Sequence, residues 1–69
     1  MFKVGDYVVC INNNDSNLRI GKVYTVEKVF IETLGLKERY QNFYKHRFKK
    51  LEDNAINRLL YPEVNWSDL

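Results

Sequence analysis

The sequence is poor in the residues that staple small proteins or bind metals. Cys10 is the only cysteine and His46 the only histidine in the 69 residues. One cysteine excludes an intramolecular disulfide, and one histidine without a cysteine pair leaves no ligand set at zinc-site spacing. We therefore expect no metal and no cofactor, and a fold that depends on its apolar core or on self-association. The lack of disulfides favours a reducing, cytoplasmic setting.

Long apolar runs and catalytic constellations are also missing. The N-terminal stretch "MFKVGDYVVCINNND" is broken by Gly5 and Asp6, so it is too short for a signal sequence or a membrane span. The carboxylates are scattered and no glycine-rich loop could cradle a phosphate. Cys10 falls within a predicted strand without a base, which indicates a buried hydrophobe rather than a nucleophile. We expect a protein that is not an enzyme and does not enter a membrane.

What the sequence does contain is β-prone apolar residues in short segments. Residues 7–11 predict a first strand in which both faces are apolar, with Val8 and Cys10 on one side. On the other side lie Tyr7, Val9 and Ile11. One face can build the interior, so the other must be covered by the C-terminal tail or by a partner.

A polar loop and a second strand follow. Residues 12–17, "NNNDSN", predict a mobile loop, and a strand begins after Gly21 with Tyr24 and Val26 on one face. Lys28 would point inward if this strand continued unbroken, which indicates a bulge or bend there. Gly35 is expected to break the apolar run "FIETLGL". For residues 36–44 a third strand with an irregular connection is favoured over a short helix.

The end of the chain predicts a turn, a short strand and a helix. The spacing of Phe48 and Leu51 suits a tight turn running into a last strand. Asp53 is expected to cap a helix that Pro62 ends. The helix would carry an apolar stripe of Ala55, Ile56, Leu59 and Leu60.

Charge is unevenly distributed although the net charge is only +2. Residues 37–50 carry six basic residues against Glu38, giving +5, whereas residues 51–69 sum to −3. Basic residues interleaved with aromatic rings are typical of nucleic-acid grooves, because cations neutralise phosphates and rings stack on bases. The stacking candidates are Tyr40, Tyr44 and His46, and the phosphate contacts are Lys37, Arg39, Lys45, Arg47, Lys49 and Lys50. The alternative is a structural one, in which the rings are core and the charges form a solvated face.

The tail offers a second candidate site. Tyr61, Val64, Trp66 and Leu69 are spaced among polar and acidic residues. Tyrosine and tryptophan are enriched among interface hot spots, so these residues are candidates for protein binding. They could equally pack back onto the first strand, or exchange between two copies in a homodimer.

The order of these motifs resembles a group of small bacteriophage proteins of the Src-homology-3-like barrel type. The resemblance depends on Gly5-Asp6, on the Gly-x-x-Tyr-x-Val pattern of residues 21–26 and on Arg47-Phe48, and it covers about residues 2–51. It implies a mainly β fold, with a small barrel domain at 1–51 and a C-terminal helix and tail at 52–69. The chain lacks the Asp/Gly-rich hairpin that many of these proteins carry before the Arg-Phe segment.

These observations favour a binding module over a catalyst. The leading hypothesis is that the protein binds a host or phage protein, which it modulates or inhibits. The alternatives are nucleic-acid binding through residues 37–50 and a structural homo-oligomer. A barrel of this class hosts several kinds of binder, so the fold alone does not decide among them.

Overall fold

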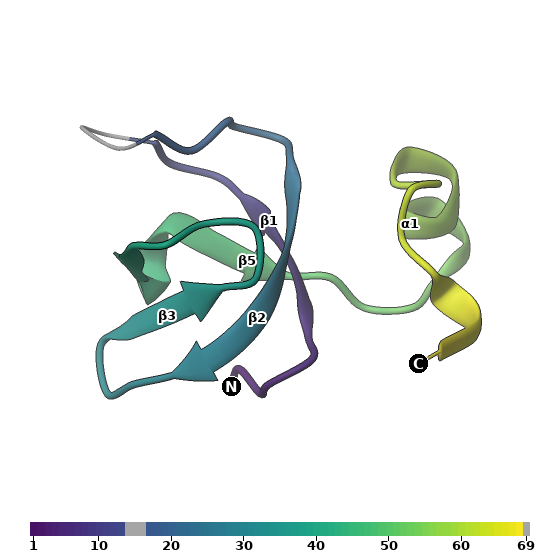
Figure 1. The fold of residues 1–69 in the computed structure, drawn as a ribbon. Helices are drawn as coiled ribbons and strands as arrows, with labels where there is room; N and C mark the ends of the chain where they lie inside the picture. Colours follow the sequence, from purple (N-terminus) through teal and green to yellow (C-terminus); the bar gives the residue numbers. More distant parts are fainter. Residues whose placement is uncertain (14–16, 69) are drawn as a thin grey trace.

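The alternating apolar segments form strands that pair into one antiparallel sheet. The structure, a computed structural model, describes residues 1–13 and 17–68, so half of the loop predicted at 12–17, residues 14–16, lies outside the described residues. The strands are β1 (Tyr7–Cys10), β2 (Val23–Val29), β3 (Thr33–Leu36), β4 (Asn42–Tyr44) and β5 (Phe48–Lys50). The helices are α1 (Ala55–Leu60) and two 3-10 turns, η1 (Lys45–Arg47) and η2 (Trp66–Asp68). The strand order is β4-β3-β2-β1-β5, and the protein is mainly β with one short α-helix (Figure 1).

The turn before β1 forms as the Gly5-Asp6 pair predicts. Gly5 has a φ of 93°, a left-handed value that suits glycine, and its N–H donates to the Val26 carbonyl at 2.8 Å. The Asp6 carboxylate accepts a hydrogen bond from the Lys3 N–H at 2.8 Å. This turn sets the start of β1 against the middle of β2.

The long strand β2 serves both halves of the sheet because it bends. Its first residues pair with β1 and its last ones pair with β3, and the register shifts between Val26 and Lys28. The bulge expected from the position of Lys28 is therefore confirmed. It lets the sheet curl over its own apolar face, as Figure 1 shows.

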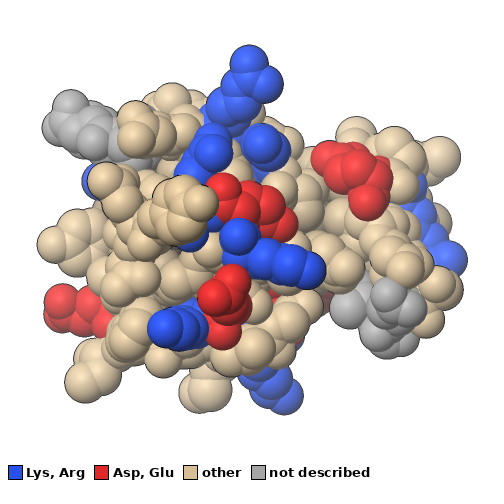
Figure 2. Space-filling view, viewed as in Figure 1, with Lys and Arg blue, Asp and Glu red and all other residues tan. Residues whose placement is uncertain are grey.

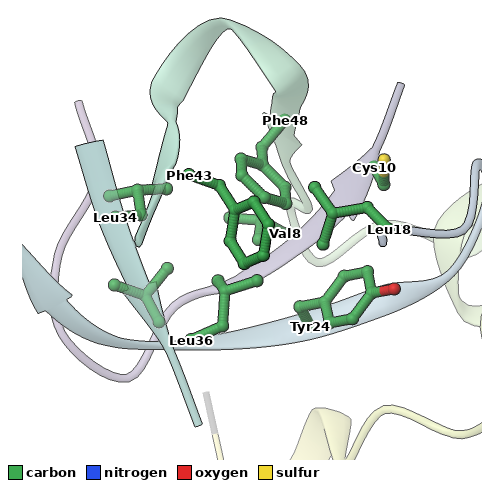
Figure 3. Close-up of a cluster of buried hydrophobic side chains, with 9 residues drawn as sticks. Val8, Cys10, Leu18, Tyr24, Leu34, Leu36, Phe43 and Phe48 are labelled. Carbon is green, nitrogen blue, oxygen red and sulfur yellow. The ribbon is translucent and has the colours of Figure 1, made fainter. Parts of the chain in front are cut away.

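The main core lies inside this curl and receives side chains from every strand. Tyr24, Leu34 and Val8 are fully buried at its centre, and Tyr24 and Phe43 each meet Phe48 edge to face. Figure 3 shows these side chains converging from opposite strands. The complete cluster comprises Val8, Cys10, Leu18, Tyr24, Val26, Leu34, Leu36, Phe43 and Phe48.

The outer face of β1 is covered by the C-terminal tail. Val9 packs in a second cluster with Leu51, Val64 and Trp66, which are all buried. Partly buried Tyr7, Val23 and Tyr61 border this cluster. The second apolar face of β1 was expected to be covered either by the tail or by a partner, and in the structure the tail covers it. The tail and α1 lie beside the sheet in Figure 1.

The structure of residues 30–44 differs from the prediction for Gly35 and excludes the short helix. Gly35 does not break the apolar run, because it lies inside β3, where it pairs with Lys28 and Asn42. The chain turns earlier, at residues 30–32, where the Phe30 N–H donates to the Thr33 carbonyl at 2.9 Å. A turn at residues 37–41 joins β3 to β4, so the short helix considered for residues 36–44 is absent.

The helix cap is a further correction. Asn54, not Asp53, is the N-cap of α1, since its side chain accepts a hydrogen bond from the Asn57 N–H at 2.8 Å. The Asp53 carboxylate instead accepts two hydrogen bonds from Arg58, at 2.6 and 2.8 Å. Asp53 and Asn54 both have side chains suited to an N-cap. Because Asp53 is engaged in the ion pair with Arg58, Asn54 takes the cap position.

Candidate functional site

The basic segment 37–50 does not form one continuous surface. Lys37, Arg39 and Tyr40 lie in the turn at one end of the β3–β4 hairpin, whereas η1 follows β4 at the other end. A three-residue strand spans about 10 Å, so the two groups are separated by at least that length. On the face shown in Figure 2, basic side chains are interspersed with acidic ones. The predicted nucleic-acid residues therefore divide into a turn group and an η1/β5 group.

Most of the η1/β5 group already has partners within the protein. Lys45 Nζ donates to the Ile31 carbonyl at 2.9 Å, and Lys50 Nζ lies 3.6 Å from the Asp6 carboxylate. The rings of Tyr44 and His46 stack on each other, with centroids 5.6 Å apart. Lys49 lies beside Val9 on the outer face of the sheet. Arg47 is half-buried, and its carbonyl accepts from the Ile11 N–H at 2.8 Å.

The turn group borders a pocket that sequence reasoning missed. Lys28, Gly35 and Asn42 form a row across β2, β3 and β4, because Gly35 pairs with both neighbours. Gly35 is buried and has no side chain, so the row has a gap at its centre. A pocket of about 220 Å³ lies here, and its lining is Glu27, Lys28, Gly35, Leu36, Lys37, Arg39, Tyr40 and Asn42. We call it the Gly35 pocket.

Two features of the sequence point to this pocket in retrospect. A lone glycine within a strand often marks a place where another group approaches the backbone closely. The Gly35 Cβ position has the Lys28 Cβ at 3.2 Å and the Asn42 Oδ1 at 3.3 Å, so a side chain there would crowd both neighbours. The bulge at Lys28 is the second signal, because it turns this lysine outward to the pocket.

Arg39 connects the Gly35 pocket to a neighbouring hollow. That hollow, of about 200 Å³, is lined by Asn17, Arg39, Tyr40, Gln41 and Phe43. The guanidinium of Arg39 lies 5.7 Å from the Tyr24 ring, and its Nη2 donates to the Asn17 carbonyl at 3.4 Å. Its Nε is buried and has no hydrogen-bond partner among the described residues. A buried N–H without an acceptor is costly to the folded state.

The Gly35 pocket carries an excess of positive charge. Lys28, Lys37 and Arg39 line it against a single carboxylate, that of Glu27. The nearby Glu38 is engaged elsewhere, since its carboxylate accepts from the Thr25 N–H and hydroxyl, both at 2.9 Å. The Tyr40 ring beside these cations is fully exposed, at 108%. Cations around a cavity with a free ring at its border suit an anion that carries a planar group.

The tail residues are placed mainly inside the protein. Val64 and Trp66 are 5% and 8% exposed and belong to the cluster on β1, and Trp66 Nε1 donates to the Tyr61 carbonyl at 3.1 Å. Tyr61 is half-buried at the border of the same cluster. Leu69 lies outside the described residues. In this arrangement Val64 and Trp66 are covered by their own chain.

The exposed apolar surface of the C-terminal segment is instead on α1. Ile56, Leu59 and Leu60 are 69%, 82% and 62% exposed, and the helix has no buried residue. At spacings of three and four residues they share one helix face.

An ion pair lies beside this face. The hydrogen bond from Arg58 holds the pKa of the Asp53 carboxyl below its ordinary value, and the same contact raises the pKa of Arg58.

The described parts of the structure gather no metal-binding cluster around the cysteine, the histidine or the carboxylates. Cys10 is buried, and its Sγ donates to the Asn12 carbonyl at 3.5 Å. Within residues 1–13 and 17–68, no group of three His, Cys, Asp or Glu side chains could hold a metal ion. The helices of this same part of the chain are too short and too polar to cross a membrane.

Three comparisons of the chain with known proteins found no match. No protein-family model matches the chain. No curated protein and no solved structure matches it either. The function must therefore be argued from the surfaces that the structure itself presents, which are the α1 stripe and the Gly35 pocket.

Proposed function

We propose that the chain is a small Src-homology-3-like barrel that binds another protein. The fold part of this proposal is supported by the strand order, in which β1 pairs with both β2 and the last strand β5. It is also supported by the bend of β2, which an antiparallel sheet needs in order to curl toward closure. The resemblance to bacteriophage proteins favours a host or phage protein as the partner, which binding would modulate or inhibit.

The observation that carries the protein-binding function is the α1 stripe, Ile56, Leu59 and Leu60. Three large aliphatic side chains face solvent on a helix that contributes nothing to either core cluster. Such residues at i, i+3 and i+4 are the anchors with which a helix enters an apolar groove of a partner. The binding residues proposed from the sequence thus shift from the tail to the helix that precedes it.

The charges around the stripe define the chemistry of the partner. Glu52, Asp53 and Glu63 are exposed near α1, and Arg58 on the helix is paired with Asp53 at 2.6 Å. Lys49 and Lys50 lie on the β5 side of Ile56, where they line a hollow with it. Figure 2 shows acidic side chains on this C-terminal part of the molecule. A complementary surface is therefore an apolar groove with basic groups facing the exposed carboxylates and no basic group beside Lys49 and Lys50.

The test compares capture by matched variants. We expect the combined substitution Ile56→Gln, Leu59→Gln and Leu60→Gln to weaken binding of the captured partner by about tenfold or more, because it removes the anchors. Glutamine keeps the helix propensity of leucine, so the fold is retained. The control is Phe30→Gln with Ile31→Gln, which removes exposed apolar surface at the β2–β3 turn. Proteins pulled from a bacterial lysate by the unaltered chain are identified by mass spectrometry, then purified and titrated against all three.

Two results would contradict the proposal. Equal loss of binding in both variants would show that general stickiness, not the stripe, holds the partner. The other result would come from light scattering at several concentrations. If the unaltered chain forms a dimer that the glutamine substitutions on α1 dissociate, the α1 stripe binds a second copy of this chain. The structural homo-oligomer would then replace the host or phage partner.

A further inference from the structure

We propose that the Gly35 pocket binds a nucleotide unit, with the phosphate among Lys28, Lys37 and Arg39 and the base against Tyr40. This site lies on β2, β3 and β4, and it is independent of the α1 stripe and of the protein-binding function proposed above. It also differs from the basic segment 37–50 as a whole, because only the turn group takes part.

The floor of the site is the backbone of Gly35, which has no side chain. Lys28 and Asn42 flank Gly35 on the two neighbouring strands, so their side chains rise on either side of bare backbone. An added Cβ would lie 3.2 Å from Lys28 Cβ and 3.3 Å from Asn42 Oδ1, tighter than ordinary contact. The backbone of Gly35 does not need glycine for its φ, because the positive-φ glycines are Gly5 and Gly21. The crowding by Lys28 and Asn42 is what requires glycine here, and it leaves bare backbone at the floor of the pocket.

The walls supply the charge that a phosphate needs. Lys28 and Lys37 make no ion pair within the described residues, and each contributes a free ammonium group. Arg39 is fixed by the Asn17 carbonyl and the Tyr24 ring, so its guanidinium is held in position before a ligand arrives. The guanidinium also carries the charged N–H donors that bind phosphate oxygens.

The Tyr40 ring provides the second half of the recognition. It is fully exposed and lines both hollows, so it stands at the border between the cations and the cavity beside Phe43. Any nucleobase can stack on such a ring, whereas an acidic side chain has no aromatic face to stack. The pocket of about 220 Å³ is too small for a drug-sized ligand and suits one unit of a longer strand.

The experiment titrates four probes into the full chain labelled for amide NMR. Inorganic phosphate, adenosine monophosphate, a short single-stranded oligothymidylate and a glutamate-rich peptide are each added at low salt. We expect shifts at residues 27–28, 35–37 and 39–42 with both nucleotide probes, and tighter binding of the oligonucleotide. The affinity should fall steeply as salt rises, because phosphate contacts release counterions. Free nucleotide binding as tightly as the strand would instead make the mononucleotide the ligand.

Matched variants decide whether the pocket is the site. Lys37→Gln should lower the salt slope by about one, and Lys49→Gln, with the same change of charge on β5, should not. Gly35→Ala fills the floor and Tyr40→Leu removes the ring, and each should weaken oligonucleotide binding by about tenfold. Tyr40 is exposed, so its substitution tests the site even if Gly35→Ala perturbs the sheet.

Three outcomes would overturn the proposal. Equal effects of Lys37→Gln and Lys49→Gln would show diffuse attraction to the whole basic segment. Binding of a glutamate-rich peptide more tightly than the oligonucleotide would make an acidic protein the ligand. No shift in the pocket with any probe at low salt would mean that it binds no nucleotide. Each leaves the α1 stripe untouched, so failure here is distinguishable from failure of the protein-binding function.

Discussion

Tyr24 connects three parts of the molecule through one side chain. It is completely buried in the main core, where its ring meets Phe48 edge to face. Its hydroxyl accepts a hydrogen bond from the Arg19 N–H at 3.0 Å, which ties the end of the long loop to β2. Arg39 of the proposed nucleotide site lies 5.7 Å from the same ring. This residue therefore links core packing, loop position and pocket geometry.

Removing only the hydroxyl tests that link. Tyr24→Phe keeps the ring in the core but leaves the Arg19 N–H without its acceptor, so the free energy of unfolding should fall by about 1–3 kcal/mol. Chemical denaturation followed by circular dichroism measures this change. The same substitution at the fully exposed Tyr40 is the control and should leave stability unchanged. Similar losses in both variants would show that the hydroxyl of Tyr24 has no special structural role.

The sequence predicts the burial of Tyr24 but not its contacts. Its place on the apolar face of a two-residue repeat is enough to turn it inward with Val26. The acceptor role of its hydroxyl depends on the path of the loop before Gly21, and the approach of Arg39 depends on a turn many residues later. Neither path is encoded in local spacing, because both follow from how distant segments pack.

At the scale of elements, α1 is held by polar contacts to the residues before its N-terminus rather than by a buried face. Its six residues include none that is buried. Asn54 caps the first turn, the Asn57 side chain donates to the Glu52 carbonyl at 2.8 Å, and Arg58 reaches back to Asp53. So short a helix is marginal in water without such contacts. The α1 stripe is presented to solvent on an element that polar contacts keep in place.

The Asp53–Arg58 pair makes one of these contacts dependent on pH. Because Arg58 lowers the folded-state pKa of Asp53, the pair stabilises the helix above the ordinary carboxyl pKa. That stabilisation is lost as the pH falls through the lowered folded value. We expect Arg58→Gln to return the pKa of Asp53 toward its ordinary value, as read from a carboxyl NMR titration. Arg19→Gln changes the net charge equally and should not move it; a shift in both variants would indicate a general charge effect.

Element boundaries show where local pattern suffices and where it fails. The first two strands and the bulge at Lys28 follow from side-chain alternation, since a lysine cannot point into the core. The fate of Gly35 does not, because a glycine can either end a strand or leave a space within it. The Gly35 pocket was missed for this reason. Its row of residues comes from three strands, whose register no single segment specifies.

At the scale of the whole molecule, β1 separates two apolar clusters of unequal size. The main core draws on every strand, whereas the second cluster joins Val9 and Leu51 to two tail residues, Val64 and Trp66. The hydrogen bonds from the Val64 N–H, the Trp66 N–H and Trp66 Nε1 end on Tyr61 or Val64, within the tail. The tail is therefore attached to the sheet mainly by packing, and it should be the first part to open.

Trp66, the only tryptophan, reports on this opening directly. We expect its fluorescence to change at a lower urea concentration than the circular dichroism of the sheet, because fewer buried contacts hold the tail. Val64→Ala should lower the first transition and leave the second in place, whereas Leu34→Ala in the main core should lower both. Coincident transitions in the unaltered chain would contradict this, and would make the tail part of one cooperative unit. In that case the second cluster around Val9 and the main core around Tyr24 would unfold together.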